Sequence, residues 1–274
     1  CIRSSRPNCM NTDFLTFGDS LTYGHELADA PHDSVLAGVI RPSQFAWPAL
    51  IGATKNLAVP GSSNEKIHRT VVRFCSKKGP PISKVGIQWT FLERWDFRHP
   101  QLEDIVTIGH WSQGNIDKLS IENYPGYSGP QSFDQAQYDK FINQFYKIIY
   151  NYDYGLLNLL QYIFYSQTFL QNKNIDYFML LASEILIDKL FDYTEQLWYN
   201  KEQKVKGYKA DNIVNNIIEL RELIDWSKFI FLEKENRPYY SFLDMAKDDD
   251  DIGIYSHPLE DSHMKFADEL RRRI

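Results

Sequence analysis

The chain has 274 residues, of which 43% are hydrophobic and 15% aromatic, and its formal net charge is −6. A chain of this kind can bury one substantial core, so we predict a single domain over residues 1–274. The acidic balance argues against nucleic acid as a partner, because neutralising phosphates requires clustered lysines and arginines. Since we find neither a long apolar run nor a secretory signal, we expect a cytoplasmic or otherwise soluble protein without a membrane span.

The cysteines Cys1, Cys9 and Cys75 are odd in number and lack metal-ligand spacing. We therefore predict neither a disulfide framework nor a metal site, and we expect no cofactor. A reducing compartment fits this pattern best. Because the chain begins at Cys1 rather than at Met, whether Cys1 is the native N-terminus stays open.

In chain order, short apolar runs rich in β-branched or aromatic residues predict five strands, at 13–17, 55–59, 84–90, 175–181 and 228–232. Apolar residues at helical spacing predict helices at 44–51, 64–74, 134–169, 184–199, 211–224 and 258–273. Strands that alternate with helices indicate a parallel sheet covered on both faces. The predicted fold class is α/β, a three-layer α/β/α sandwich with a central parallel five-stranded sheet.

Two segments depart from this alternation. Residues 91–133 lack clean periodicity and are too long for an ordinary connection, so we predict a loop insertion there. Its aromatic residues could wall a pocket or stack on sugar rings, or form a satellite cluster that holds the loop down; they are Trp95, Phe97, His99 and Trp111. In 134–169, apolar residues recur at steps of three and four, which core packing or a dimer face explains better than a ligand site does. Whether the chain forms a homo-oligomer therefore stays an open question.

The most informative motif is residues 14–24, FLTFGDSLTYG, where a strand-like run stops at Gly18, Asp19 and Ser20. A parallel strand that breaks at glycine into a helix presents its last side chains at the carboxyl edge of the sheet, where open α/β folds bind ligands. Ser20 is therefore the candidate nucleophile. The alternative is a plain β-turn in which Asp19 and Ser20 bond their own backbone.

A serine nucleophile needs a base within hydrogen-bond reach and donors for the oxyanion. Near the C-terminus, His257 and Pro258 open the last predicted helix, and His263 follows six residues later. We assign His257 as the base and interpret His263 as a packing or capping imidazole. Glu260 precedes His263 by three residues and offers a rival pair, against which the His-Pro spacing argues.

These segments resemble the blocks of the SGNH hydrolases, also called the GDSL esterase/lipase family, and Gly18-Asp19-Ser20-Leu21 matches the signature tetrapeptide. The resemblance implies a flavodoxin-like fold with Ser20 as nucleophile and His257 as base. It also implies that Gly61, in the segment 56–64, donates its backbone N–H to the oxyanion together with the N–H of Ser20. Glycine there permits close backbone approach.

The chain departs from the family pattern at two places. The third block is Gly-x-Asn-Asp, whereas this chain has Gln88, Trp89, Thr90 and Phe91, so Thr90 stands where the asparagine donor should be. The third oxyanion donor is then Thr90 or, with slight preference, Asn64.

The acid is the second departure, because the position three residues before His257 is occupied by Ile254. Asp251, or Asp250 beside it, could reach the imidazole through a bulged loop. Otherwise the site would be a Ser-His dyad oriented by a backbone carbonyl. Since the acid mainly fixes the tautomer and stabilises the imidazolium, losing it would weaken catalysis more than abolish the mechanism.

The resemblance implies a serine esterase that hydrolyses a carboxylic ester through an acyl-enzyme intermediate. The aromatic insertion favours O-acetyl groups on carbohydrates, so the expected partner is a small-molecule or glycan ester. Asp19, Trp89 and Trp95 are the candidate substrate-binding residues. The alternatives are a catalytically impaired protein of the same fold that binds a glycan or lipid, and an acyltransferase.

Overall fold

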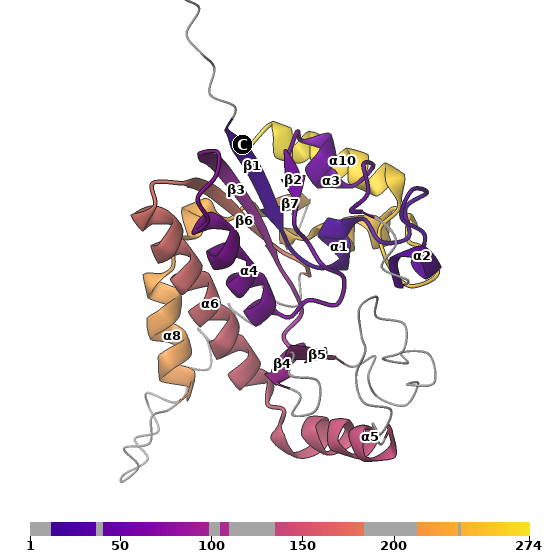
Figure 1. The fold of residues 1–274 in the computed structure, drawn as a ribbon, viewed down its shortest axis with the longest axis vertical. Helices are drawn as coiled ribbons and strands as arrows, with labels where there is room; N and C mark the ends of the chain where they lie inside the picture. Colours follow the sequence, from indigo (N-terminus) through magenta and orange to yellow (C-terminus); the bar gives the residue numbers. More distant parts are fainter. Residues whose placement is uncertain (1–11, 37–40, 99–104, 110–134, 184–212, 235–236) are drawn as a thin grey trace, which may run out of the picture.

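The computed structural model describes residues 12–36, 41–98, 105–109, 135–183, 213–234 and 237–274. Within these residues a four-stranded sheet has the order β2-β1-β3-β6, and every neighbouring pair is parallel. The strands of this sheet are β1 Asp13–Phe17, β2 Lys55–Asn56, β3 Ile82–Trp89 and β6 Asp176–Leu181. The predicted α/β class with a central parallel sheet flanked by helices is confirmed (Figure 1).

The helices follow the predicted alternation where their residues are described. Those before the middle of the chain are α1 Ser20–Tyr23, α2 His32–Leu36, α3 Trp47–Leu50 and α4 Asn64–Cys75. Those after it are α5 Gln135–Gln144, α6 Tyr152–Asn172, α8 Ile213–Leu223, α9 Phe242–Asp248 and α10 Glu260–Arg271. The predicted helix at 184–199 lies outside the described residues. None of the described helices has the length and apolar character needed to cross a bilayer.

Helices cover both faces of the sheet, α4, α6 and α8 on one side and α3 and α10 on the other (Figure 1). On β6 the side chains alternate between the two cores. Tyr177, Met179 and Leu181 belong to the first, and Phe178 and Leu180 belong to the second. Because both faces are buried, the central strands have almost continuous apolar sequences, as β6 does.

The predicted fifth strand at 228–232 differs from the structure. Within the described residues, Phe229 alone pairs with the sheet, through a single parallel bridge to Met179, where the N–H of Ile230 donates to the Met179 carbonyl at 2.9 Å. The chain then leaves the sheet, because β7 (Leu232–Lys234) pairs antiparallel with β8 (Arg237–Tyr240). Burial of Leu232 in the second core accompanies this turn.

The region predicted as a loop insertion contains regular structure that the sequence pattern did not predict. β4 (Trp95–Arg98) and β5 (Ile105–Ile108) form an antiparallel hairpin. The ring of Trp95 stacks on Tyr154 at 5.4 Å and contacts Phe145 edge-on at 5.6 Å. Trp95 therefore belongs to an aromatic cluster that holds the hairpin against the helices. His99 and Trp111 lie outside the described residues.

The helix predicted over 134–169 is interrupted. A π-helical turn, η4 Phe145–Ile149, follows α5, and Tyr150 then adopts an extended conformation. Asn151 caps α6 by accepting from the N–H of Asp153. The predicted apolar stripe therefore has a buried part and an exposed part. Leu156, Leu160 and Ile163 on α6 are buried, whereas Ile148 and Ile149 are 73% and 63% exposed.

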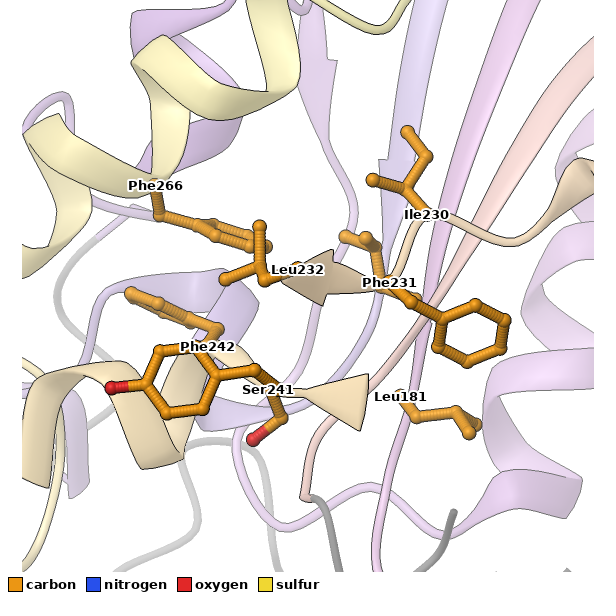
Figure 2. Close-up of a pocket in the computed structure, with 9 residues that line it drawn as sticks. Leu181, Ile230, Phe231, Leu232, Ser241, Phe242 and Phe266 are labelled. Carbon is orange, nitrogen blue, oxygen red and sulfur yellow. The ribbon is translucent and has the colours of Figure 1, made fainter. Parts of the chain in front are cut away.

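A small pocket lies between β6, the β7–β8 hairpin and α10 (Figure 2). It is lined by Leu180, Leu181, Ile230, Phe231, Leu232, Tyr240, Ser241, Phe242 and Phe266. None of these residues is a candidate catalytic residue, and eight of the nine are apolar or aromatic. The pocket is a packing feature lined mainly by the second core, and it contains none of the candidate catalytic residues.

His263 lies in that second core and is 1% exposed. Its Nδ1 accepts the backbone N–H of Trp47 at 3.0 Å, and its ring meets Phe242 edge-on at 4.7 Å. Because Nδ1 is the acceptor, the proton resides on Nε2. Glu260 instead accepts the N–H of Ala28 at 2.8 Å, so the rival Glu260–His263 pair does not form. His263 is a packing imidazole that joins α10 to α3.

Burial lowers the pKa of His263 to about 3. Between the ordinary value of 6.5 and about 3, the unfolded chain binds a proton there that the folded chain excludes. We expect the free energy of unfolding to fall with decreasing pH by up to about 1.4 kcal/mol per pH unit from this group. Urea unfolding of wild type and His263→Asn across that pH range measures it. The asparagine variant should show a smaller slope, and equal slopes would contradict the assignment.

Candidate active site

The tetrapeptide at the end of β1 forms a tight strand-to-helix turn. Ser20 is the first residue of α1 and is 6% exposed, and Asp19 is the N-cap, accepting the N–H of Leu21 at 3.0 Å. A Cβ on Gly18 would lie 2.1 Å from Thr22 Oγ1, so only glycine fits this close approach. The turn places Ser20 at the carboxyl edge of the sheet, where the sequence predicted it.

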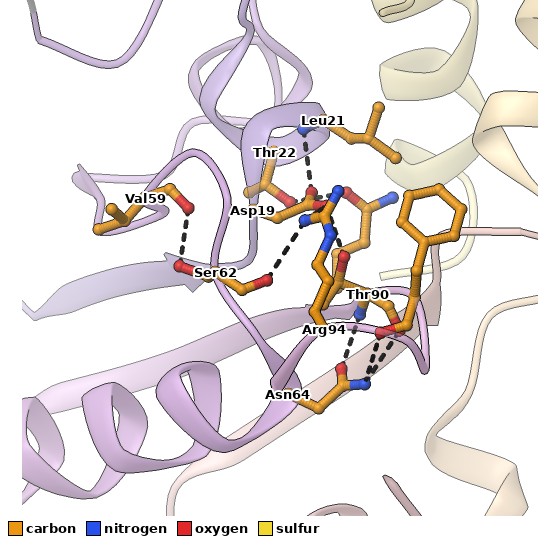
Figure 3. A network of polar contacts seen from close by, with 10 residues as sticks. Asp19, Leu21, Thr22, Val59, Ser62, Asn64, Thr90 and Arg94 are labelled. Carbon is orange, nitrogen blue, oxygen red and sulfur yellow. Dashed lines mark hydrogen bonds and ion pairs between the residues drawn. The ribbon is translucent and has the colours of Figure 1, made fainter. Parts of the chain in front are cut away.

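Asp19 is the centre of a buried polar network (Figure 3). Its Oδ2 accepts from the Thr90 hydroxyl at 2.6 Å and from Arg94 Nη1 at 2.7 Å, while Oδ1 accepts from Leu21. Its exposure is 0%. Three donors therefore hold the carboxylate inside the turn, and the expectation that Asp19 binds substrate is wrong for a side chain so enclosed.

The segment predicted to supply the glycine donor lies beside this turn. The N–H of Val59 donates to the Gly18 carbonyl at 3.2 Å, and Gly61 adopts a left-handed conformation with φ 72°. In the part of the chain that the structure describes, neither the N–H of Ser20 nor that of Gly61 donates to another group. Two backbone donors on adjacent segments are thus available at the edge of the sheet.

The two candidates for the third oxyanion donor are both engaged elsewhere (Figure 3). Asn64 Nδ2 donates to the Thr90 carbonyl at 3.0 Å, and Asn64 Oδ1 accepts the Thr90 N–H at 2.8 Å. The Thr90 hydroxyl donates to Asp19. The side chains of Asn64 and Thr90 therefore lock α4 and Asp19 to the end of β3, which corrects their predicted role.

His257 has a carboxylate partner that the sequence analysis missed. Glu26 Oε2 lies 2.9 Å from His257 Nδ1 and 3.1 Å from the His257 backbone N–H. The Glu26 carboxylate also accepts the N–H of Tyr255 at 3.0 and 3.1 Å. Glu26 itself has φ 75°, which is unusual for a residue with a side chain. It lies six residues after Ser20, in the loop that follows α1.

Asp251, the predicted acid, does not contact the imidazole of His257. Its Oδ2 accepts the N–H of Ser262 at 2.6 Å, and its carbonyl accepts the N–H of Leu259 at 3.0 Å. It therefore anchors the first turn of α10. The bulged loop that the prediction required does not bring Asp251 to His257, and Glu26 occupies the imidazole nitrogen instead.

The electrostatics fix the tautomer of His257. Burial would raise the pKa of Glu26, but hydrogen bonds from Tyr255 and His257 outweigh burial and lower it. Glu26 is then an acceptor at neutral pH, so Nδ1 of His257 carries the proton and Nε2 holds a lone pair. Burial lowers the pKa of His257, against the opposing effect of Glu26, so the ring is neutral at pH 7 and able to accept a proton.

Aromatic rings stack behind His257. His25 lies 4.5 Å from it between ring centroids, His32 stacks on His25 at 4.8 Å, and Tyr255 stacks on His32 at 3.6 Å. Burial, with His257 and His32 nearby, lowers the pKa of His25 to about 4. The His25 ring thus packs against the His257 imidazole, and Glu26 fixes the orientation of the imidazole through Nδ1.

Ser20 and His257 belong to one cluster. The N–H of His25 donates to the Ser20 carbonyl at 3.1 Å, and the ring of His25 packs on His257. The charges of Asp19 and Arg94 also act on the pKa of His257. Both Ser20 and His257 are described, yet no hydrogen bond joins Ser20 Oγ to the imidazole. In enzymes without substrate, such bonds are often long or unformed.

Trp89, the remaining candidate for substrate binding, lies in the first core. It is 0% exposed, and its Nε1 points to the sulfur of Met179 at 3.4 Å. The prediction was wrong because Trp89 is the last residue of β3, where the alternation of the strand turns it inward.

Comparison with known proteins gives a likeness at the level of structure. No family model and no curated protein matches the chain. Among solved structures, the chain is similar to a protein from Desulfitobacterium hafniense DCB-2 that is provisionally described as a lipolytic protein of the G-D-S-L family. The similarity covers 96% of this chain and 100% of that one, with 12% identity and a TM-score of 0.40.

The Glu26–His257 contact predicts a titration. Glu26 raises the pKa of His257 through its charge and hydrogen bond, so Glu26→Gln should move that pKa further below its ordinary value. NMR titration of the His257 ring proton measures the shift. Asp251→Asn is the matched control and should leave the titration unchanged. A shift in the control and none in Glu26→Gln would restore Asp251 as the partner.

Proposed function

We propose that the chain is a serine esterase of the SGNH type, with Ser20 as nucleophile and His257 as base. The observation that carries the proposal is the meeting of three features at one sheet edge. These are a serine in a strand-to-helix turn, two backbone N–H groups that have no partner among the described residues, and a neutral imidazole whose Nδ1–H is held by a carboxylate. Acyl transfer needs these groups together.

In the proposed reaction, Ser20 Oγ attacks the ester carbonyl while its proton moves to Nε2 of His257. The electron pair of the carbonyl π bond moves to oxygen, where the N–H groups of Ser20 and Gly61 stabilise the charge. Collapse of this intermediate expels the alcohol, which takes the proton from His257, and leaves an acyl-serine. Water, deprotonated by His257, then releases the acid and regenerates Ser20.

Glu26 takes the part of the acid in this proposal. Its carboxylate accepts the Nδ1 proton, which keeps Nε2 free to act as base and stabilises the imidazolium during transfer. Glu26 holds the backbone of the histidine loop as well, through Tyr255 and His257. Since the acid comes from the nucleophile's own segment, the usual position before the histidine can be occupied by Ile254 without loss of the mechanism.

The flavodoxin-like five-stranded arrangement belongs to the same proposal. Two observations support it: the strand order β2-β1-β3-β6, and the parallel bridge of Phe229 to Met179 on the outer side of β6. This order brings the ends of β1 and β3 side by side. The two strand ends carry Ser20 and Thr90, respectively, into the site.

For the substrate we propose a carboxylic ester, with O-acetyl groups on carbohydrates as the preferred class. Ile254 and Tyr255, which are 89% and 49% exposed, lie shortly before His257. One face of the Tyr255 ring is stacked on His32, and a half-exposed aromatic ring of this kind suits the face of a sugar. Trp95 supports this less than expected, because its ring is packed against the helices.

A second candidate is a protein of this fold that binds a glycan or lipid without catalysis. Two observations favour it: the engagement of Asn64 and Thr90 elsewhere and the missing Ser20–His257 hydrogen bond between these described residues. The two candidates differ in whether Ser20 is activated, which a covalent probe reports.

Fluorophosphonate labelling read by intact mass is the test of activation. Wild type should take up one label, because an activated serine attacks the phosphorus readily, whereas Ser20→Ala and His257→Ala should not. Ser166→Ala is the matched control, since the fully buried Ser166 places its Oγ 2.8 Å from His68 Nδ1 in a second Ser–His pair. Unlabelled wild type would favour the binding protein, and label on Ser20→Ala would overturn the assignment.

The pH dependence of ester hydrolysis has a predicted sign. His257 must be neutral to act as base, and burial lowers its pKa from 6.5. The acid limb of kcat/KM for p-nitrophenyl acetate should therefore have its midpoint below pH 6.5, with activity lost as pH falls through it. A midpoint above that value would show that the buried, Glu26-bound imidazole is not the group that titrates.

A further inference from the structure

Arg94 lies between the two segments that carry the backbone donors of the site (Figure 3). Its Nη1 is 2.7 Å from Asp19 Oδ2 and 3.2 Å from the carbonyl oxygen of Ser62. Asp19 directly precedes Ser20, and Ser62 directly follows Gly61. A single guanidinium group therefore bridges the residue beside each of the two N–H donors.

The Arg94 guanidinium is held in place and largely shielded from solvent. The Arg94 side chain is 9% exposed, its Asp19 partner 0%, and the guanidinium carbon lies 5.0 Å from the centre of the Phe91 ring. Charges act more strongly in such a place than in water. Both charges of the pair also act on His257, whose pKa is lowered mainly by burial: Asp19 raises that pKa and Arg94 lowers it.

Asp19 carries the opposite charge, so the two residues act on the site as an ion pair. Its carboxylate also accepts from the Leu21 N–H and the Thr90 hydroxyl, which stabilise the negative charge without removing it. The Ser62 carbonyl adds only a dipole. Without the guanidinium, the Asp19 carboxylate would place an unopposed negative charge next to the N–H groups of Ser20 and Gly61, so the contribution of Arg94 to the local field favours an oxyanion there.

We infer that Arg94 stabilises the oxyanion in place of the asparagine amide that the site lacks. This inference rests on the proposed esterase function. Asn64 and Thr90 are engaged with main chain and with Asp19, whereas Arg94 brings a full charge to the same strand end. Preorganised charge directed at a developing oxyanion lowers the barrier, and losing one such group typically costs about 10²-fold or more in kcat.

The experiment must separate this role from that of a structural partner for Asp19. Arg94→Met alone would leave a buried carboxylate unpaired and could unfold the site. The double variant Asp19→Asn/Arg94→Met removes both charges, and the introduced amide can still accept from Leu21 or Thr90. Asp19→Asn alone reports the cost of that amide. Arg69→Met/Asp96→Asn, which removes another ion pair with a buried carboxylate, is the matched control.

Three readouts are compared: kcat and KM for p-nitrophenyl acetate, the Ki of a trifluoromethyl ketone that forms a hemiketal oxyanion on an active serine, and fluorophosphonate labelling. In the double variant, relative to Asp19→Asn, kcat should fall about 10²-fold with little change in KM. The Ki should rise by a similar factor. Arg94→Lys, which keeps the charge, should retain more of kcat than the methionine variant.

Three other outcomes would contradict the role of Arg94, its mode of action or the esterase function. A double variant that retains kcat within about threefold of Asp19→Asn would show that Arg94 only balances Asp19. A raised KM with unchanged kcat would show that Arg94 contributes to binding of the ester in the ground state and not to stabilisation of the oxyanion. Wild type that neither hydrolyses ester nor takes up fluorophosphonate would overturn the esterase function itself, and this inference with it.

Discussion

The buried carboxylate of Asp19 is the constraint on which the rest of the site depends. A carboxylate at 0% exposure is costly unless donors surround it, and here they come from α1, from the end of β3 and from the segment after it. Satisfying one side chain thus draws three parts of the chain together. The turn that presents Ser20 and the loop that presents Gly61 are held at the same sheet edge as a consequence.

Glu26 connects the segment of His257 to the segment of Ser20. Its carboxylate holds the loop before α10 by two backbone N–H groups and the ring of His257 by Nδ1. A Cβ on Gly253 would lie 2.6 Å from the Glu26 carboxylate, so glycine there leaves room for this contact. The proposed base, His257, is therefore oriented by the same segment, residues 19–26, that carries the proposed nucleophile, Ser20, and both halves of the candidate site depend on one local fold.

The sequence predicted the elements that have strong local signals. β1 and α4 lie within a residue of their predicted bounds, because one is an apolar strand ending at Gly18 and the other an amphipathic helix capped by Ser63. The motifs also singled out Ser20, Gly61 and His257 as candidate site residues. The β4–β5 hairpin and the break before α6 were missed, since Asn151 capping and aromatic packing leave little periodic trace.

Glu26, Arg94 and the true partners of Asn64 could not be predicted from spacing. Glu26 meets His257 across 231 positions, and Arg94 meets Asp19 across 75. Such contacts depend on which loops the sheet order brings together. The sequence showed only what is missing: Ile254 stands at the usual acid position and Thr90 at the usual donor position, and neither residue indicates which distant side chain lies near the site.

The central claim is that Ser20 and Gly61 hold an oxyanion in front of a His257 oriented by Glu26. The most direct measurement is a crystal structure of the chain after reaction with a fluorophosphonate. The account predicts phosphorus on Ser20 Oγ, with its free oxygen roughly 3 Å from the N–H groups of Ser20 and Gly61, and His257 still bound to Glu26. A phosphoryl oxygen bound instead by Asn64, or an imidazole turned onto Asp251, would contradict it.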